Sequence, residues 1–301
     1  MSAAMPSAMH LPPRSASGRR APGAILRIAA TALAGGFLCA TMVRFSPGFG
    51  VDENQLDPRL SRQSREALER SHDGERNVFA FYVSYLKHAF AGDLGTSPSL
   101  DQPIASLIAQ RAPVTARLMA YGISGAWLLA MALVVPPMLW RLPALGAIFT
   151  VMSGLAAALP AAAIAIVLFR VGGSAQATIA LILFPKLYYY LRNLLRQSYG
   201  MPHVLLARAK GLGRNRILLR HVLPVAGPQL IALAAVSVNL AFGAAIAVEA
   251  ICDLPGIGQL AWKAALARDL PVLVVVTVMV TVLTQVSNLA ADFCMPARSR
   301  A

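Results

Sequence analysis

The residues best suited to chemistry lie in a basic segment between His203 and Pro224, which holds five cations, two histidines and no acidic residue. A basic amphipathic segment of this kind binds anionic lipid or a partner surface rather than transforming a substrate. Gly211 and Gly213 interrupt it. Because glycine ends helices and proline begins them, the pattern predicts a helix over residues 201–209, a turn, and a second helical stretch that ends where Pro224 begins the next helix.

A second candidate is Glu249, which ends a charge-free run over residues 221–248. An ionisable group at the centre of a membrane helix costs about 2.5 to 3.5 kcal/mol, so such a residue needs a reason to be there. One interpretation makes Glu249 part of an outer gate together with Pro255, Gly256 and Gly258. The other makes it a helix-end carboxylate at the membrane interface. The sequence leaves both open.

The remaining reactive side chains form no catalytic or metal-binding pattern. The three cysteines are far apart and the five histidines form no spaced pair on one helix face, so neither a disulfide framework nor a metal site is expected. The sequence contains no Gly-Lys-Ser/Thr phosphate loop and no Gly-x-Ser-x-Gly nucleophile motif. We therefore expect no catalytic residue, no metal and no cofactor, and do not expect an enzyme.

Long charge-free stretches flank these candidates and indicate a membrane protein. Hydrophobic residues make up 57% of the 301 residues and charged residues 13%, and the mean hydropathy is +0.60. An α-helix needs about 20 apolar residues to cross the roughly 30 Å hydrocarbon core of a bilayer. The sequence therefore predicts an all-α integral membrane protein with six transmembrane helices, built on residues 28–43, 118–140, 142–169, 171–185, 221–248 and 270–291.

Two of the six stretches are too short on their own. The first spans the bilayer if Arg27 and Arg44 extend their charged ends to the two interfaces, and the fourth extends over 172–191 if Lys186 does the same. The third, over 142–169, is expected to be one span in spite of an internal proline, because membrane helices tolerate proline.

The net charge of +14 follows the positive-inside rule, so no nucleic-acid partner is expected. If the N-terminus is cytoplasmic, six spans place fifteen of the 27 cations in cytoplasmic segments and all 13 acidic residues outside them. The sequence thus predicts that both termini and the basic segment lie in the cytoplasm, against the lipid bilayer.

The same pattern divides the chain into parts. The first apolar stretch is expected to remain as an anchor, and a cleaved signal peptide is the alternative. Within the long loop that follows it, residues 61–70 and 79–90 have helical patterns. The predicted parts are a disordered cytoplasmic tail (1–23), the first transmembrane helix (24–44), an extracytoplasmic loop or cap (45–111), a core of five transmembrane helices with the loop 192–224 (112–295), and a cytoplasmic tail (296–301).

The basic segment matches a motif written Glu-Ala-Ala, three residues, Gly, nine residues, Ile-x-Leu-Pro. Ala207 takes the second Ala, Gly211 the Gly, and Leu223-Pro224 the final pair, while Leu205 replaces the Glu and His221 the Ile. With this motif the basic segment resembles the coupling loop of bacterial ABC importer permeases. Its particular residues resemble the branch of the family that imports dipeptides, oligopeptides and nickel.

Two further regions resemble the same branch. Residues 90–97 (Phe-Ala-Gly-Asp-Leu-Gly-Thr-Ser), with Arg111 and Thr115, resemble the segment before its second membrane helix. Residues 248–258 and 267–271 resemble its periplasmic turn and sixth helix. The resemblance covers most of the chain.

The resemblance implies a type I ABC importer permease in the bacterial plasma (inner) membrane. Its partners would be a sister permease subunit, two ABC ATPase subunits and an extracytoplasmic solute-binding protein, for which the loop over 45–111 is a cap or a passive spacer. The substrates would be peptides, nickel or related small solutes. This chain has three alanines after Leu159-Pro160, where the family usually has an aromatic pair, which leaves the substrate open.

The resemblance also implies a role for the loop. It would dock on a separate ATPase subunit, with Pro224 starting the fifth membrane helix. A transport-inactive scaffold or sensor that keeps the docking loop is the alternative. The residues assigned to close backbone approach are Ala207, Ala209 and Gly211, and those assigned to polar docking are Arg208, Lys210, Arg214 and Arg216.

Overall fold

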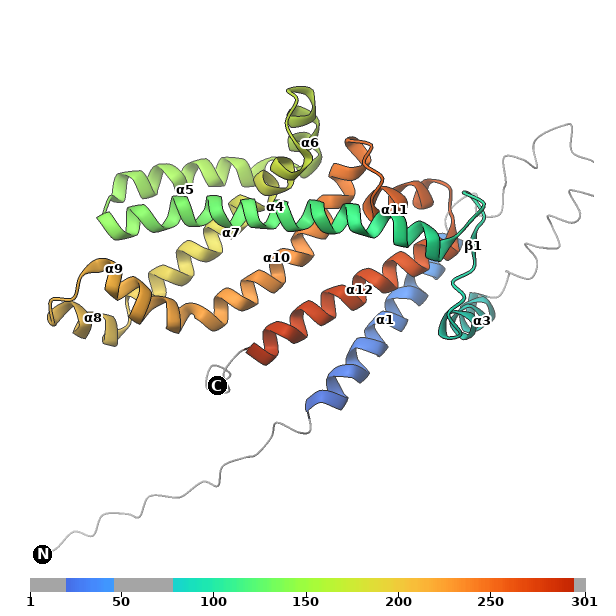
Figure 1. The fold of residues 1–301 in the computed structure, drawn as a ribbon, viewed down its shortest axis with the longest axis horizontal. Helices are drawn as coiled ribbons and strands as arrows, with labels where there is room; N and C mark the ends of the chain where they lie inside the picture. The colour runs from blue at the N-terminus through green and yellow to red at the C-terminus, as the bar shows by residue number, and fades with distance from the viewer. Residues whose placement is uncertain (1–19, 46–77, 295–301) are drawn as a thin grey trace, which may run out of the picture.

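A computed structural model describes residues 20–45 and 78–294 of the chain (Figure 1). Most of the predicted N-terminal tail, the helical pattern over 61–70 and the predicted C-terminal tail lie outside the described residues. Except for two strands of two residues each, β1 (Thr96–Ser97) and β2 (Gln102–Pro103), every regular element in the described ranges is helical. The all-α fold class is thus confirmed.

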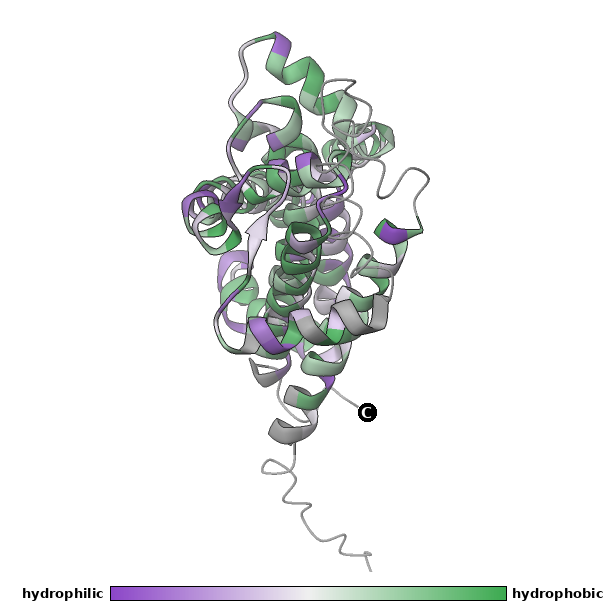
Figure 2. Cartoon of the chain, turned by 90° about the vertical axis from the view of Figure 1, so that its right-hand side faces the viewer, coloured by the Kyte–Doolittle hydropathy of each residue, from purple (hydrophilic) through white to green (hydrophobic). Residues whose placement is uncertain are grey.

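Four helices are long and apolar enough to cross a membrane. They correspond to the first, second, fifth and sixth predicted spans, and Figure 2 shows that hydrophobic residues dominate the long helices. The agreement follows from the absence of charge over about 20 residues, which is the strongest sequence signal for a spanning helix. The four are α1 (Arg20–Arg44), α4 (Ile104–Trp140), α10 (Leu223–Ile251) and α12 (Leu270–Cys294).

The third predicted span is wrong as one straight helix. It consists of α5 (Pro143–Ala158) and α6 (Ala161–Arg170), which meet at an angle of 97°. Pro160 causes the break, because it has no N–H to continue the hydrogen-bond ladder and forces the preceding Leu159 out of helical geometry, to ψ 132°. The pair is either one broken span or a re-entrant segment.

The fourth predicted span forms a helix, α7 (Ala175–Tyr199), that runs eight residues beyond the predicted end at 191. It is not among the helices apolar enough to span a membrane, because Lys186, Arg192 and Arg196 lie in its second half. The described residues therefore contain four such helices, or five if the bent pair is one span, and the predicted count of six is not confirmed.

Helix α7 is nevertheless the centre of the bundle. It packs against α4, α10 and α5, and Leu183, Leu187, Leu191 and Leu195 are buried along one side of it. Its contact with α4 is close, because a Cβ atom at Gly122 would lie 2.5 Å from Cγ2 of Ile179. The core is thus built around a helix that also carries Lys186, Arg192 and Arg196.

The bundle has two different ends (Figure 1). The end that we name the loop end carries α8 (Pro202–Ala209), α9 (Arg214–Ile217) and a π-helix, η2 (Leu218–Val222). The opposite end, which we name the α11 end, carries α3 (Val78–Phe90), the two short strands and α11 (Ile257–Leu266). Helix α3 coincides with the helical pattern predicted over 79–90. The described start of α1 and the end of α12 both point toward the loop end.

Candidate functional site

The loop end is organised around the turn that follows α8. Gly211 has φ +74°, and its N–H donates to the carbonyl of Arg208 at 2.9 Å while the N–H of Leu212 donates to the carbonyl of Ala207 at 3.3 Å. This pair of bonds is the Schellman motif, which satisfies the last carbonyls of a helix and needs a left-handed residue. A Cβ atom at Gly211 would meet nothing within 4 Å, so the backbone conformation, not crowding, favours glycine.

One face of the loop is anchored to the rest of the chain. Ala207 is only 3% exposed, so it packs within the chain itself and is not available for close approach by a partner. Ala209 and Gly211, in contrast, are exposed. The buried hydrophobic residues that fix the loop in place are Val204, Ala207, Ile217, Leu218 and Val222.

The opposite face of the loop combines apolar and basic side chains. Leu205, Leu206 and Leu219 are between 55% and 62% exposed, so they add apolar surface to the loop. The cations Lys210, Arg216 and Arg220 are exposed beside them in the sequence. The face can bind a surface that offers both an apolar groove and acidic groups.

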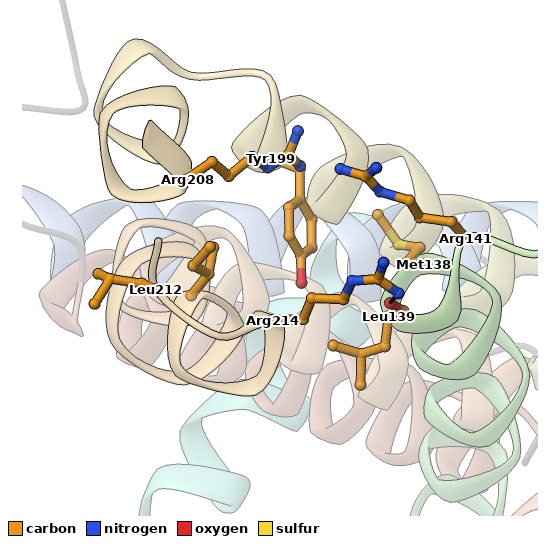
Figure 3. Close-up of a pocket in the computed structure, with 8 residues that line it drawn as sticks. Met138, Leu139, Arg141, Tyr199, Arg208, Leu212 and Arg214 are labelled. Atoms are coloured by element: carbon orange, nitrogen blue, oxygen red, sulfur yellow. Dashed lines mark hydrogen bonds between the residues drawn. The ribbon is translucent and has the colours of Figure 1, made fainter. Parts of the chain in front are cut away.

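Two of the four cations predicted for docking instead contact the chain itself. The guanidinium carbon of Arg208 lies 5.7 Å from the ring centre of Tyr199, and Nη1 of Arg214 donates to the carbonyl of Leu139 at 2.9 Å. Both side chains line a cavity of about 220 Å³ between the loop and the ends of α4 and α7 (Figure 3). The structure therefore separates Arg208 and Arg214 from Lys210 and Arg216.

Helix α10 begins at Leu223, with Pro224 in its first turn. The chain is helical without a break from Arg214 to Ile251, and the π-helix η2 lies just before Leu223 and Pro224. The N–H of Leu223 donates to the carbonyl of Leu218, five residues back, which is π geometry. The wider turn accommodates Pro224, whose ring would crowd the carbonyl four residues before it in an α-helix.

His221, the residue that replaces the isoleucine of the motif, joins α8 to the π-helix. Its carbonyl accepts a hydrogen bond from Nε2 of His203 at 3.1 Å. Its own Nδ1 is buried without a hydrogen-bond partner in the described part of the chain. The two histidines thus hold the two halves of the loop together on its inner side.

At the α11 end, Glu249 is completely buried. Its carboxylate accepts hydrogen bonds from Thr115 Oγ1 at 2.7 Å, from the N–H of Gly258 at 2.7 Å and from the N–H of Gln259 at 3.2 Å. These backbone N–H groups belong to the first turn of α11, where a helix favours a negative charge. Glu249 therefore joins α10, α4 and α11 through one carboxylate.

Gly256 and Gly258 are required by space rather than by backbone conformation. A Cβ atom at Gly256 would lie 2.2 Å from the carboxyl carbon of Glu249, and one at Gly258 would lie 2.6 Å from Cα of Ile246. Pro255 is exposed and forms the tight turn in which the N–H of Gly256 donates to the carbonyl of Leu254 at 2.7 Å. The four residues that the sequence grouped as a possible gate are thus close together.

Three residues that complete this cluster, Arg111, Thr115 and Gln259, were not predicted to be site residues from the sequence. Thr115 Oγ1 also accepts from the N–H of Ile257 at 2.8 Å, and Nη1 of Arg111 donates to Oε1 of Gln259 at 3.1 Å. Thr115 and Arg111 were noted only as matches to a family segment. Thr115 and Arg111 lie more than 130 residues from their partners in the sequence. The one signal that could have indicated them is that they are polar residues in the N-terminal part of a membrane helix.

A second buried carboxylate, Asp269, was also missed. It is 3% exposed, and it accepts from Ser99 Oγ at 2.6 Å, from Ser97 Oγ, and from the N–H of Val272 at 3.2 Å. It caps α12 and fixes the turn between β1 and β2. An aspartate directly before a Leu-Pro helix start is a typical N-cap signal, which could have identified it.

The chemistry available to these two regions is binding and mechanical connection. In the described ranges, no three His, Cys, Asp or Glu residues form a group that could hold a metal ion. The buried carboxylates at the α11 end bond to helix N-termini, and the loop end presents cations and leucines outward. The described residues thus form a helical bundle, with helices long and apolar enough to cross a membrane, that carries a basic loop at one end and buried carboxylates at the other.

Comparison with known proteins identifies the family. Residues 122–300 match the family model described as the binding-protein-dependent transport system inner membrane component. That match covers more than half of the chain. The protein belongs to this family, the permeases of ABC importers, and is a multi-pass inner membrane protein.

Three relatives from other bacteria support the assignment. The chain is 27% identical to the dipeptide transport system permease protein DppB of Lactococcus lactis, over 85% of this chain and 91% of the relative. It is 26% identical to the oligopeptide permease AppB of Bacillus subtilis (79% and 84%) and 30% identical to OppB of Escherichia coli (79% and 84%). These relatives are permease subunits, which confirms that the chain is a transporter component and not an enzyme.

Proposed function

We propose that this chain is the permease subunit of an ATP-driven importer for peptides or related small solutes such as nickel, and that residues 201–224 couple it to separate ATPase subunits. The names of the relatives support peptides as the substrate class. The observation that carries the coupling role is the loop's outer face, where exposed leucines stand beside exposed cations on a turn held by a Schellman motif.

The continuity of the helix from the loop into the bundle supports a lever mechanism. The sequence has no phosphate loop of its own, so the force for alternating access comes from another subunit. The uninterrupted helical stretch from Arg214 to Ile251 has 38 residues, which corresponds to about 57 Å at 1.5 Å per residue. A displacement of α9 is therefore carried along α10 to Glu249 at the α11 end.

All four cations are exposed, and the docking chemistry follows from which of them contact the rest of the chain. Lys210 and Arg216 are free to pair with acidic groups of the ATPase, and Leu206 enters an apolar groove. Ala209 and Gly211 allow close approach of the partner's backbone because neither carries a large side chain. Arg208 and Arg214 act on the inner side and hold the loop against α4 and α7.

The other partners follow the same orientation. The loop end and both chain termini face the cytoplasm, and the α11 end faces a solute-binding protein outside it. A sister permease subunit and two ATPase subunits complete the importer. Glu249, with Pro255, Gly256 and Gly258, forms the outer gate, which moves as a unit because the carboxylate bonds α11 to α10 and α4.

The coupling role is tested by purification of the tagged complex from native membranes in mild detergent. Lys210→Glu combined with Arg216→Glu is expected to reduce the amount of ATPase that co-purifies at least tenfold, because like charges then face the acidic groups of the ATPase. Lys87→Glu on α3, an exposed lysine at the α11 end, is the matched control and retains the ATPase. Full retention by the double variant contradicts the proposal.

A second substitution tests the turn that follows α8. Gly211→Asp places a side chain at φ +74° and adds a negative charge to the turn, and it is expected to release the ATPase as well.

A complex that keeps the ATPase but whose ATP hydrolysis does not respond to any peptide would instead indicate a transport-inactive scaffold.

A further inference from the structure

The cavity behind the loop combines an unusual set of side chains. It has a volume of about 220 Å³ and is lined by residues of the α4 end, the α7 end and the loop. Figure 3 shows three arginines around it, Arg141, Arg208 and Arg214, with the ring of Tyr199 between Arg208 and Arg214. Arg141 lies 58 positions or more before the other three residues, which all fall within residues 199–214, so the fold brings the end of α4 to this short segment.

The charges of this cavity are not balanced by the chain itself. None of its lining residues is acidic, and within the described ranges none of the three arginines forms an ion pair. Like charges around one cavity repel each other, and the repulsion increases where water is partly excluded. The carbonyl of Leu139 takes only one N–H of Arg214, so most guanidinium donors around the cavity remain available.

A further feature indicates a ligand. The hydroxyl of Tyr199 is buried and has no hydrogen-bond partner in the described part of the chain, although buried hydroxyls are nearly always bonded. Arg141 has φ +55°, a left-handed conformation that arginine rarely adopts, at the position where a glycine would end α4 without strain. The left-handed conformation of Arg141 ends α4, and the unsatisfied hydroxyl of Tyr199 beside three guanidinium groups is explained if an anion is bound in the cavity.

We propose that Arg141, Arg208, Arg214 and Tyr199 form a binding site for a phosphate group. The guanidinium group presents its N–H donors in a fork that matches phosphate oxygens, and three such groups approaching from α4, α8 and α9 suit a tetrahedral anion better than a planar carboxylate. Two sources share this chemistry, the headgroup of an anionic phospholipid and free phosphate. A basic pocket between helix ends at a membrane surface is a typical place for the former.

This phosphate site does not depend on the identity of the transported solute. Its occupation would affect the position of the loop relative to the bundle. A bound phosphate would connect the end of α4 to α8 and α9, in addition to the single direct bond from Arg214 to Leu139. It would hold the loop in its observed position relative to the bundle.

The test uses the full chain, purified in detergent and then placed in nanodiscs. One arm compares phosphatidylcholine nanodiscs with nanodiscs that contain phosphatidylglycerol, and counts the lipids retained on the protein by native mass spectrometry. The other arm titrates inorganic phosphate into delipidated protein and follows the melting temperature. Retention of phosphatidylglycerol alone assigns a lipid headgroup, and a phosphate-dependent rise in melting temperature assigns free phosphate.

Variants show whether the signal comes from this cavity. Arg141→Ala and Arg208→Ala are each expected to weaken binding about tenfold, because each removes a charge-assisted hydrogen bond. Tyr199→Phe keeps the ring under Arg208 and removes only the hydroxyl, so a smaller loss is expected. Arg216→Ala, in the same loop but outside the cavity, is the control and binds as the wild type does.

Two results would overturn the proposal, and the first needs only the wild-type chain. One is a wild-type chain that binds neither phosphate nor phosphatidylglycerol above phosphatidylcholine. The other is an equal loss of binding in Arg216→Ala and Arg141→Ala, which would indicate general attraction of the basic loop to anions.

Discussion

The two ends of the bundle differ in where their characteristic charged side chains lie. At the α11 end, Glu249 and Asp269 are buried, and both accept hydrogen bonds from the first turn of a helix. At the loop end, Lys210, Arg216 and Arg220 are exposed. The two buried carboxylates are therefore satisfied within the chain, and the three exposed cations are directed outward.

The difference teaches how a single helix can connect a fixed region to an adaptable one. A buried carboxylate is stable only with several hydrogen bonds, so its partners must stay in place. Exposed cations make weak contacts and can exchange partners at little cost. Helix α10 joins both, because it continues from the loop and carries Glu249 near its other end.

The glycines show the same contrast. Gly256 and Gly258 lie against Glu249 and Ile246, with no room for a methyl group. Gly211 and Gly213 have open space around them. At the α11 end glycine is needed for packing, and at the loop end Gly211, with φ +74°, is needed for the turn.

The largest effect is expected for Gly256→Ala. The new methyl group would expel the carboxylate of Glu249, so the variant loses all the hydrogen bonds of that group and adds a steric clash, together about 4 kcal/mol of stability. Its melting temperature in detergent, followed by size-exclusion chromatography, measures this. Gly213→Ala, where nothing lies within 4 Å, is the control. Equal melting temperatures for the two variants would contradict the close packing at Gly256.

Glu249→Ala is expected to have the next largest effect. It leaves the hydroxyl of Thr115 and two backbone N–H groups of α11 buried without an acceptor, which costs about 3 kcal/mol. Asp253→Asn is the matched control, since Asp253 is an exposed acid whose ion pair with Lys263 spans 3.7 Å, and pairs of this kind contribute little. The same thermal denaturation experiment compares them, and a Glu249→Ala protein as stable as Asp253→Asn would show that the cluster is not structural.

Asp269→Ala should cost less, about 2 kcal/mol, because it removes the cap of α12 and frees two serine hydroxyls that can find other partners. Hydrogen exchange of residues 96–103 and 270–273 reports the loss locally. Ser99→Ala, which removes one partner and keeps the cap, is the control. Unchanged exchange at the start of α12 in Asp269→Ala would exclude the capping role.

The sequence predicted the parts of the fold that depend on local composition. Charge-free runs located four spanning helices, and Gly211 predicted the turn after α8. Pro160 was the exception, since the tolerance of membrane helices for proline concealed a bend of 97°. Whether a proline kinks a helix or breaks it depends on the packing around it, which composition does not contain.

The candidate sites were predicted unequally. Glu249, Pro255, Gly256 and Gly258 are close in sequence and lie close together in the structure, but Thr115 and Gln259 complete the cluster through contacts that no spacing rule predicts. The basic residues of the loop were treated as one set. Only the fold shows that Arg208 and Arg214 face a cavity, since their direction depends on the position of Tyr199 and Leu139.

The smallest change in stability is expected for a substitution at the junction between the two regions. Pro224→Ala restores an N–H that can donate to the carbonyl of Arg220, and so favours an α-helix where the chain now has the π-helix η2. The gained bond and the better helix propensity offset the local rearrangement. The free energy of unfolding should therefore change by less than about 1 kcal/mol, which a melting experiment in detergent measures.

The same substitution is expected to change the direction of the loop. A π-helix contains one extra residue, and its removal turns everything before it by about 100° around the axis of α10. The exposed cations would then face away from the ATPase, and retention of the ATPase in the purified complex should fall although the protein stays folded. Pro228→Ala, one turn further along α10 and outside the π-helix, is the control. If Pro224→Ala kept the ATPase as well as Pro228→Ala does, the π-helix would not set the direction of the loop, and the contrast between a fixed and an adaptable end would have to arise within α8 and α9 alone.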